Sequence, residues 1–238
     1  AKEGVMAQLT LWNTEKKSSP TSSAFIPAPS SYMLLCEDTF LAGFNHVQTY
    51  IQGLLNEKPM PVIVWDLKPL SGILLTLEGL SASAAIAVGT LCAMREHVQF
   101  DERLHTNLGQ IDTKNAAISA SFLDDGRLGR VEGLKEKIQA IEDYNNKNRG
   151  SLNQVYVARN QSELFEPRGF KIAACHHITN LIETLARDTN ATALFGEYPH
   201  VIDALHNKAN QSIDFYADFT GRDWLKKKVI DEVKQVLA

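Results

Sequence analysis

Short apolar runs of strand length alternate with longer segments of helical periodicity along most of this chain. Strands are predicted at residues 5–12, 32–36, 62–66, 73–77, 116–123, 127–131, 155–158 and 170–174. Helices are predicted at residues 38–56, 81–96, 132–145 and 178–187, and loops at 16–31 and 100–115. Strands that alternate with helices over about 180 residues predict one mixed α/β (α+β) domain, in which helices cover the sheet.

Two local signals predict where elements begin and turn. Asp38 precedes the apolar helical stripe that starts with Phe40, so it is a predicted N-cap. Asp124-Asp125-Gly126 separates two apolar runs, and Asp-Gly between such runs is typical of a β-hairpin. The helix at 132–145 would follow directly on this hairpin.

The alternation of strands and helices stops near residue 188. Beyond it, the pattern predicts helices at 198–207 and 222–237, joined by a loop. We therefore divide the chain into an N-terminal strand and loop at 1–30, an α/β domain at 31–188 and a helical extension at 189–238.

Composition argues against several classes of function. A net charge of −4 gives no reason to expect nucleic acid or an anionic membrane as partner. A membrane-spanning helix needs about 18 consecutive apolar residues, and no segment of this sequence is that long. Cys36, Cys92 and Cys175 are widely spaced, which favours buried free thiols of a reducing cytoplasm over a disulfide framework or a zinc site. His176 and His177 are adjacent and lack an acidic partner at ligand spacing, so we expect no metal.

One serine stands where a catalytic nucleophile gains chemical support. Glu78-Gly79-Leu80-Ser81-Ala82 places Ser81 after a glycine turn and at the start of a predicted helix. Glycine permits a tight turn, and the first N–H groups of a helix have no partner within the helix. Those groups and the helix dipole can stabilise an oxyanion. A serine that follows a glycine near a helix start is more often simply a cap, so this segment alone is weak support for catalysis.

A second segment supplies a candidate base. In Glu132-Gly133-Leu134-Lys135-Glu136-Lys137 a lysine follows the hairpin and enters a helix. Next to apolar Leu134 and Ile138, Lys135 could be partly desolvated, and desolvation lowers the pKa of an amine toward the range of a general base. Serine–lysine pairs are a known way to activate a hydroxyl. A lone lysine segment of this kind is more often a solvated helix face.

Taken together, the two segments resemble the proteolytic domain of Lon proteases. That family carries its serine in Asp-Gly-Pro-Ser-Ala-Gly and its lysine in Gly-Gly-Leu-Lys-Glu-Lys. Residues 78–83 match the first segment, with Glu78, Leu80 and Ser83 as departures, and residues 132–137 match the second more closely.

The resemblance covers about residues 30–188 and implies a ribosomal S5 domain 2-like fold. It implies a peptide-hydrolysing dyad of Ser81 and Lys135, without a metal or cofactor. Ser119 takes the place of a threonine that supports the lysine in that family, and Glu78, Gly79 and Ala82 would support the nucleophile. The substrate would be a protein or peptide.

A weaker resemblance lies near the end of the chain. Residues 218–225, Asp-Phe-Thr-Gly-Arg-Asp-Trp-Leu, are similar to the segment that precedes the nucleotide-binding core of STAND-type NTPases. No phosphate-binding loop follows it in this sequence. The resemblance implies a protease effector of a larger protein, with ATP bound on an adjoining module, possible self-association and a cytoplasmic location.

Two alternatives stay open. Gly79 to Ala85 also resembles the phosphate loop of GHMP-type small-molecule kinases, which would bind ATP there, but that interpretation leaves the Lys135 segment unexplained. The non-enzyme alternative is a degenerate Lon-like fold that serves as an interaction module.

Overall fold

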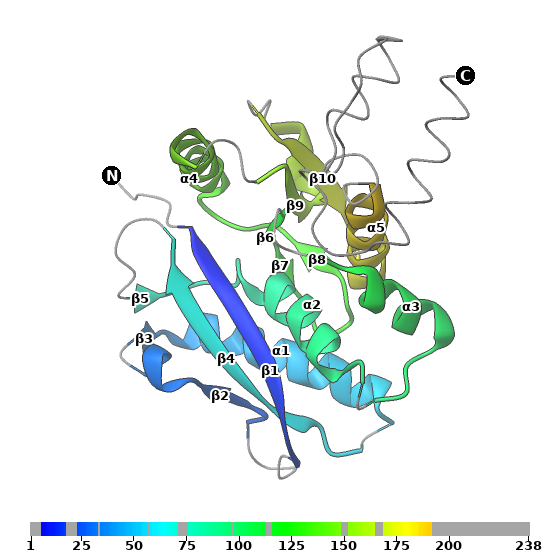
Figure 1. Ribbon diagram of the computed structural model, residues 1–238. Coiled ribbons are helices and arrows are strands. Elements are labelled where there is room, and N and C mark those ends of the chain that lie inside the picture. Colours follow the sequence, from blue (N-terminus) through cyan, green and yellow to red (C-terminus); the bar gives the residue numbers. More distant parts are fainter. Residues whose placement is uncertain are drawn as a thin grey trace, which may run out of the picture. The chain divides into compact units, whose positions relative to one another are not determined.

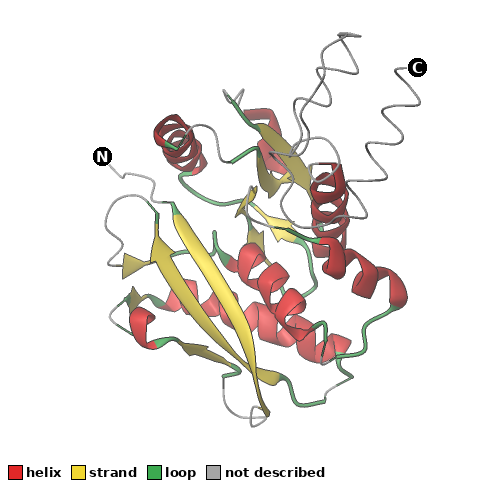
Figure 2. Ribbon diagram, in the orientation of Figure 1, coloured by secondary structure: helices red, strands yellow, loops and turns green. Residues whose placement is uncertain are grey.

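A computed structural model describes residues 6–17, 23–32, 34–56, 58–70, 76–96, 98–112, 116–148, 152–164 and 169–191. Within these ranges the chain is a mixed α/β structure with five α-helices and four small sheets (Figures 1 and 2). The chain divides into two compact units, Ala1–Arg187 and Asp188–Ala238. The candidate site residues all lie in the first unit. The helices predicted at 198–207 and 222–237, and the segment 218–225, lie outside the described residues.

The first sheet forms the front layer of Figure 1, where β1 and β4 cross in front of two helices. Its strand order is β1 (Ala7–Lys17), β4 (Pro61–Pro69) and β2 (Phe25–Pro27), with β1 antiparallel and β2 parallel to β4. Ile63 and Trp65 of β4 are buried in one core cluster with residues of α1 (Asp38–Leu54) and α2 (Ser83–Met94). The helices therefore cover the inner face of this sheet.

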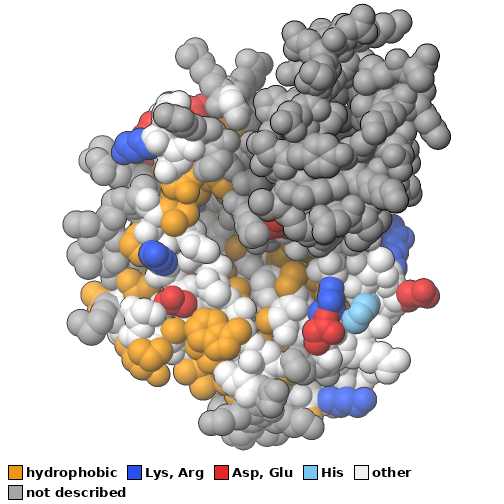
Figure 3. All heavy atoms as spheres, viewed as in Figure 1, with side chains coloured by type: hydrophobic (Ala, Val, Ile, Leu, Met, Phe, Trp, Pro, Cys, Tyr) orange, Lys and Arg blue, Asp and Glu red, His pale blue; other side chains and the backbone are white. Residues whose placement is uncertain are grey.

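The outer face of the same sheet carries an apolar strip. Trp12 of β1 and Ile26 of β2 both pair in register with Val64 of β4, and each is 41% exposed. Side chains alternate between the two faces of a strand. Ile63 and Trp65, the buried neighbours of Val64, therefore point to the helices, while Trp12, Ile26 and Val64 point outward. Figure 3 shows hydrophobic side chains gathered on this side of the molecule.

A second sheet has only parallel strands, in the order β10 (Lys171–Cys175), β9 (Gln154–Ala158) and β6 (Ala116–Ser119). Its two faces contribute to different cores. Val155 and Val157 pack with α4 (Leu134–Lys147), whereas Tyr156 and Ala158 belong to the main core that contains α1 and α2. The sheet thus lies between α4 and the rest of the domain.

Two short strand pairs complete the sheets. β3 (Leu35–Cys36) pairs in parallel with β5 (Thr76–Leu77), directly before the segment that bears Ser81. β7 (Ser121–Phe122) and β8 (Leu128–Gly129) form the antiparallel hairpin that the Asp-Gly signal predicted, and Gly126 has the positive φ of +85° that such a turn favours. The described part of the chain also has two 3-10 helices, Pro29–Ser31 and Arg159–Leu164.

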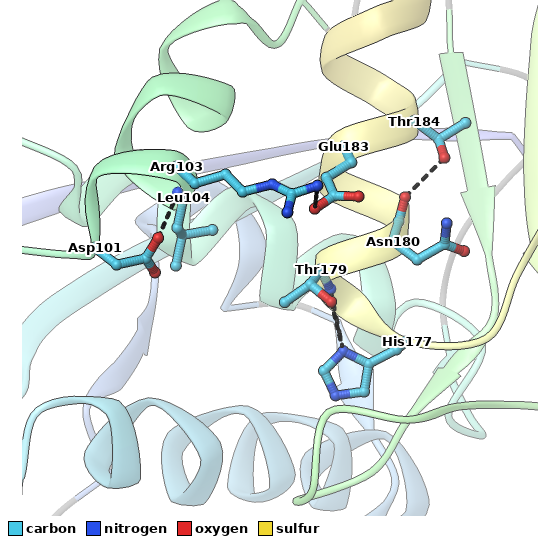
Figure 4. Close-up of polar contacts among 8 residues, drawn as sticks. All are labelled: Asp101, Arg103, Leu104, His177, Thr179, Asn180, Glu183 and Thr184. Atoms are coloured by element: carbon cyan, nitrogen blue, oxygen red, sulfur yellow. Dashed lines mark hydrogen bonds and ion pairs between the residues drawn. The ribbon is translucent and has the colours of Figure 1, made fainter.

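The segment predicted as a loop at 100–115 instead contains a helix, α3 (Glu102–Gln110). Asp101 caps it by accepting a hydrogen bond from the N–H of Leu104 at 3.0 Å. Arg103 forms an ion pair with Glu183 of α5 (Ile178–Ala191) at 2.8 Å (Figure 4). Leu108 of α3 is buried, and Leu104 and Ile111 pack partly against the same core. These three residues have helical spacing, a short apolar stripe that the loop prediction overlooked because the rest of the segment is polar.

Two predicted helix starts also change. Asp38 is the first residue of α1 rather than its N-cap, because Glu37 occupies the extended position before the helix. The second helix begins at Ser83, so Ser81 lies in the turn that precedes it.

The three cysteines are free thiols, with Cys175 buried and Cys36 and Cys92 partly buried. Among the described helices, none has the length and apolar character needed to cross a membrane.

Candidate active site

The turn that bears Ser81 is held in place from its start. Gly79 has a φ of +72°, a conformation that residues with a Cβ seldom adopt. Its N–H donates a hydrogen bond to Oγ1 of Thr39 in the first turn of α1, at 2.9 Å. Glu78, one residue earlier, is exposed. The backbone therefore reverses at Gly79 while it is tied to a neighbouring helix.

The other end of the turn is held by Ser83. This residue is 1% exposed, and its Oγ donates to the carbonyl of Leu80 at 2.6 Å. The same oxygen accepts a hydrogen bond from the backbone N–H of Phe122 in β7, at 2.7 Å. The hydroxyl of Ser83 is thus fully used in structure, which leaves Ser81 as the serine of this segment with a hydroxyl available for chemistry.

Ser81 is half-buried, and its hydroxyl makes no hydrogen bond to any part of the chain that the structure describes. The backbone N–H groups of Ser81 and Ala82 likewise have no acceptor there. Ala82 occupies the N-cap position of α2, and its carbonyl accepts the hydrogen bond from Ile86. An unpaired hydroxyl beside two unpaired amides at the positive end of a helix is the arrangement that an acyl-transfer nucleophile and its oxyanion need.

Lys135 is the second residue of α4, after Gly133, whose φ is +63°. Its side chain is exposed and makes no hydrogen bond to the described residues. This differs from the desolvated environment expected beside Leu134 and Ile138, which are both buried. The reason is angular: successive residues of a helix point about 100° apart, so a neighbour of a buried residue can face the solvent.

Lys137 is the lysine of this segment that the fold shields. It is half-buried, and its Nζ donates to the carbonyl of Glu132 at 2.6 Å. Burial lowers the pKa of Lys137, while the nearby carboxylates of Glu136 and Glu132 act in the opposite direction. The sequence did not single out this lysine. The signal was present, because residue 137 falls between the buried positions 134 and 141 at intervals of three and four.

Ser119 lies at the end of β6 and is 9% exposed. Its Oγ is the one buried side-chain N or O atom without a hydrogen-bond partner in the described residues. Ser119 pairs in register with Val157, so both side chains lie on the sheet face that α4 covers. A buried hydroxyl normally has a partner, and an unsatisfied one marks a place where a donor or acceptor can be added.

The fold brings the Ser81 segment and the Ser119 segment together. The N–H of Ala84 in α2 donates to the carbonyl of Ala120, at 3.3 Å, one residue after Ser119. α4, which begins with Leu134 and Lys135, packs on the face that carries Ser119. No hydrogen bond joins Ser81 to Lys135 within the described structure. The Ser81 turn is thus hydrogen-bonded to the segment after Ser119, and α4 packs on the sheet that contains Ser119. The side chain of Lys135 is exposed to solvent.

No known family model matches this chain, and no curated protein matches it.

Proposed function

We propose that this chain is a serine endopeptidase of the Lon-like type, in which Ser81 is the nucleophile and Lys135 is the base. The observation that carries the proposal is the state of Ser81. Its half-buried hydroxyl lies on a turn held at both ends, and neither this hydroxyl nor the two amides beside it has a hydrogen-bond partner among the described residues. The substrate is a peptide bond in a protein or peptide chain. The resemblance at 218–225 supports a role as the effector of a larger, nucleotide-regulated cytoplasmic protein.

The proposed chemistry has two stages. Neutral Lys135 accepts the proton of the Ser81 hydroxyl as Oγ attacks the carbonyl carbon of the substrate. The amides of Ser81 and Ala82 donate to the oxyanion that forms. Lys135 then returns the proton to the leaving amine, which leaves an acyl ester on Ser81. Water, deprotonated by Lys135, hydrolyses that ester and restores the serine.

The dyad requires Lys135 to leave its exposed position and turn toward Ser81. Ser119 supports this step, because its buried hydroxyl has no partner in the described residues and lies on the face of the sheet that α4 covers. In the proposed active form the Nζ of Lys135 bonds to Oγ of Ser119, which would satisfy that hydroxyl and orient the amine. The described structure then shows one rotamer of Lys135, with the nucleophile in place. Because exposed side chains exchange rotamers within nanoseconds, the chain alone would reach the active form.

Cleavage kinetics test the proposal directly. An unfolded protein such as reduced casein is incubated with the wild-type chain and with Ser81→Ala, Lys135→Met and Ser30→Ala variants. Loss of the nucleophile should abolish cleavage, and loss of the base should slow it by about 10²- to 10⁴-fold. Ser30→Ala is the control, because Ser30 is an exposed serine bonded to Asp66 on another part of the fold. Cleavage that persists in Ser81→Ala would contradict the assignment.

One observation favours a second candidate, a non-catalytic interaction module. Lys135 is exposed and forms no hydrogen bond to Ser81 in the described structure. A separated serine and lysine are what we expect in a chain that has lost catalysis. This alternative predicts that neither the wild-type chain nor any of the three variants cleaves the substrate.

A further inference from the structure

We propose that Ser83 is a positioning residue for the dyad: its hydroxyl locks the turn that bears Ser81 to the hairpin that leads to Lys135. This inference rests on the proposed function, and it gives a task to a residue at which this chain departs from the Lon-like pattern. The side chain itself would not touch the substrate.

Two hydrogen bonds from Ser83 to the carbonyl of Leu80 close the turn around Ser81. Its Oγ donates to the carbonyl of Leu80, the residue before Ser81, while Ser83 itself is the second residue after Ser81. The backbone of Ser83 adds the second link, because its N–H also donates to the carbonyl of Leu80, at 3.0 Å. The turn is therefore closed around Ser81, and the free amides of Ser81 and Ala82 are held in a fixed orientation.

The same hydroxyl extends the link beyond the turn. It accepts the N–H of Phe122 at 2.7 Å, across 39 positions of sequence, and Phe122 pairs with Leu128 in the hairpin. The hairpin is tightly closed, because a Cβ on Gly129 would lie 2.6 Å from Oγ of Ser121. From Gly129 the chain continues into α4 and Lys135. Ser83 is thus the point at which the segments of both catalytic residues meet.

The surroundings of Ser83 leave its side chain little freedom. It is 1% exposed, and a Cβ on Gly43 of α1 would lie 2.9 Å from the Cβ of Ser83. Helix α1 can approach this closely because residue 43 is glycine. A hydroxyl confined in this way keeps its two partners and holds their relative position. A displacement of about 1 Å in a catalytic group can cost on the order of a hundredfold in rate.

A matched pair of variants separates positioning from stability. Ser31 is also 1% exposed, and its Oγ also makes two bonds, donating to Asp66 at 2.7 Å and accepting from the N–H of Leu67 at 3.0 Å. Ser31→Ala and Ser83→Ala therefore each remove one donated and one accepted hydrogen bond from a side chain that is 1% exposed; the acceptor is a carboxylate for Ser31 and a backbone carbonyl for Ser83. Both should lower the thermal midpoint. Only Ser83→Ala should lower kcat and the rate of acylation at Ser81, by about ten- to a hundredfold, with KM within twofold.

A Ser83→Cys variant provides a second test if Ser83→Ala does not fold. A thiol is a weak donor and a weak acceptor, so the kcat of Ser83→Cys should lie between the kcat of wild type and that of Ser83→Ala. Amide hydrogen exchange supplies a readout that is independent of catalysis. Exchange at Phe122 should accelerate in the Ser83 variants and stay unchanged in Ser31→Ala.

The outcomes distinguish this inference from the proposed function. Equal kcat in wild type and Ser83→Ala, an equal loss of kcat in both alanine variants, or unchanged exchange at Phe122 would each overturn the positioning role while Ser81 remains the nucleophile. A wild-type protein that neither cleaves peptides nor acylates at Ser81 would overturn the proposed function and, with it, any catalytic role for Ser83.

Discussion

Lys135 and Lys137 lie in the first turn of the same helix but in different environments. Lys135 is exposed and unbonded within the described structure, whereas Lys137 is half-buried and donates to the carbonyl of Glu132. Burial lowers the pKa of Lys137, and a lowered pKa favours the neutral amine that a general base must be. The hydrogen bonding of Lys137 argues against it as the base, because its Nζ is already bonded to the carbonyl of Glu132. We propose Lys135 as the base because its Nζ makes no hydrogen bond within the described structure, whereas that of Lys137 does.

Methionine substitutions at the two lysines test this assignment. Methionine keeps the apolar stem and removes the amine, so packing changes little. Lys135→Met should lower kcat by about 10²- to 10⁴-fold, the usual contribution of a general base. Lys137→Met should leave kcat within a few-fold of wild type. Steady-state cleavage of a fluorogenic peptide measures both, and the reverse ranking would move the base to Lys137.

At the scale of elements, the turn at 79–82 depends on one glycine. Gly79 has a φ of +72°, and a Cβ there would meet nothing within 4 Å. Alanine at this position is therefore opposed by backbone conformation alone. Gly53, near the end of α1, has equally open space where a Cβ would lie, but its φ is not positive. Comparing alanine substitutions at Gly79 and Gly53 therefore measures the free-energy cost of the left-handed backbone without a contribution from packing.

Gly79→Ala should lower the free energy of unfolding by about 1–2 kcal/mol, the usual penalty for an L-residue in the left-handed region. Gly53→Ala should raise it by up to about 1 kcal/mol, because alanine is the better helix former. Urea unfolding monitored by circular dichroism measures both changes. A neutral Gly79→Ala would mean that the turn does not require the left-handed conformation.

At the scale of the whole molecule, sequence periodicity was enough to predict the mixed α/β class and the β7–β8 hairpin. It missed α3 because that helix is stabilised by the Asp101 cap and the Arg103–Glu183 ion pair, with Leu108 as its one buried residue. A cap followed by a polar segment resembles a loop, and the ion-pair partner lies far along the sequence. The periodic signal of α3 is only three residues long, Leu104, Leu108 and Ile111, and the polar residues around it favoured the loop prediction.

The candidate site was predictable to the same limited degree. The glycine turn before α2 was predicted correctly because its signal is local. The helix start was predicted two residues too early, so Ser81 lies in the turn and not in the first turn of the helix. The bond from Phe122 to Ser83 and the unpartnered hydroxyl of Ser119 are tertiary features, set by strands far apart in sequence. Local pattern also could not show that Lys135 faces solvent while Lys137 is shielded. That depends on the side of α4 that packs on the sheet.

The central claim is that the hydroxyl of Ser81 is the nucleophile, and covalent labelling tests it most directly. The intact chain is treated with a fluorophosphonate, which reacts with activated serines, and the mass and position of the adduct are determined by mass spectrometry. We predict a single adduct on the peptide that contains Ser81, absent in Ser81→Ala and retained in Ser30→Ala. An adduct on another serine, or no adduct on the wild-type chain, would contradict the claim.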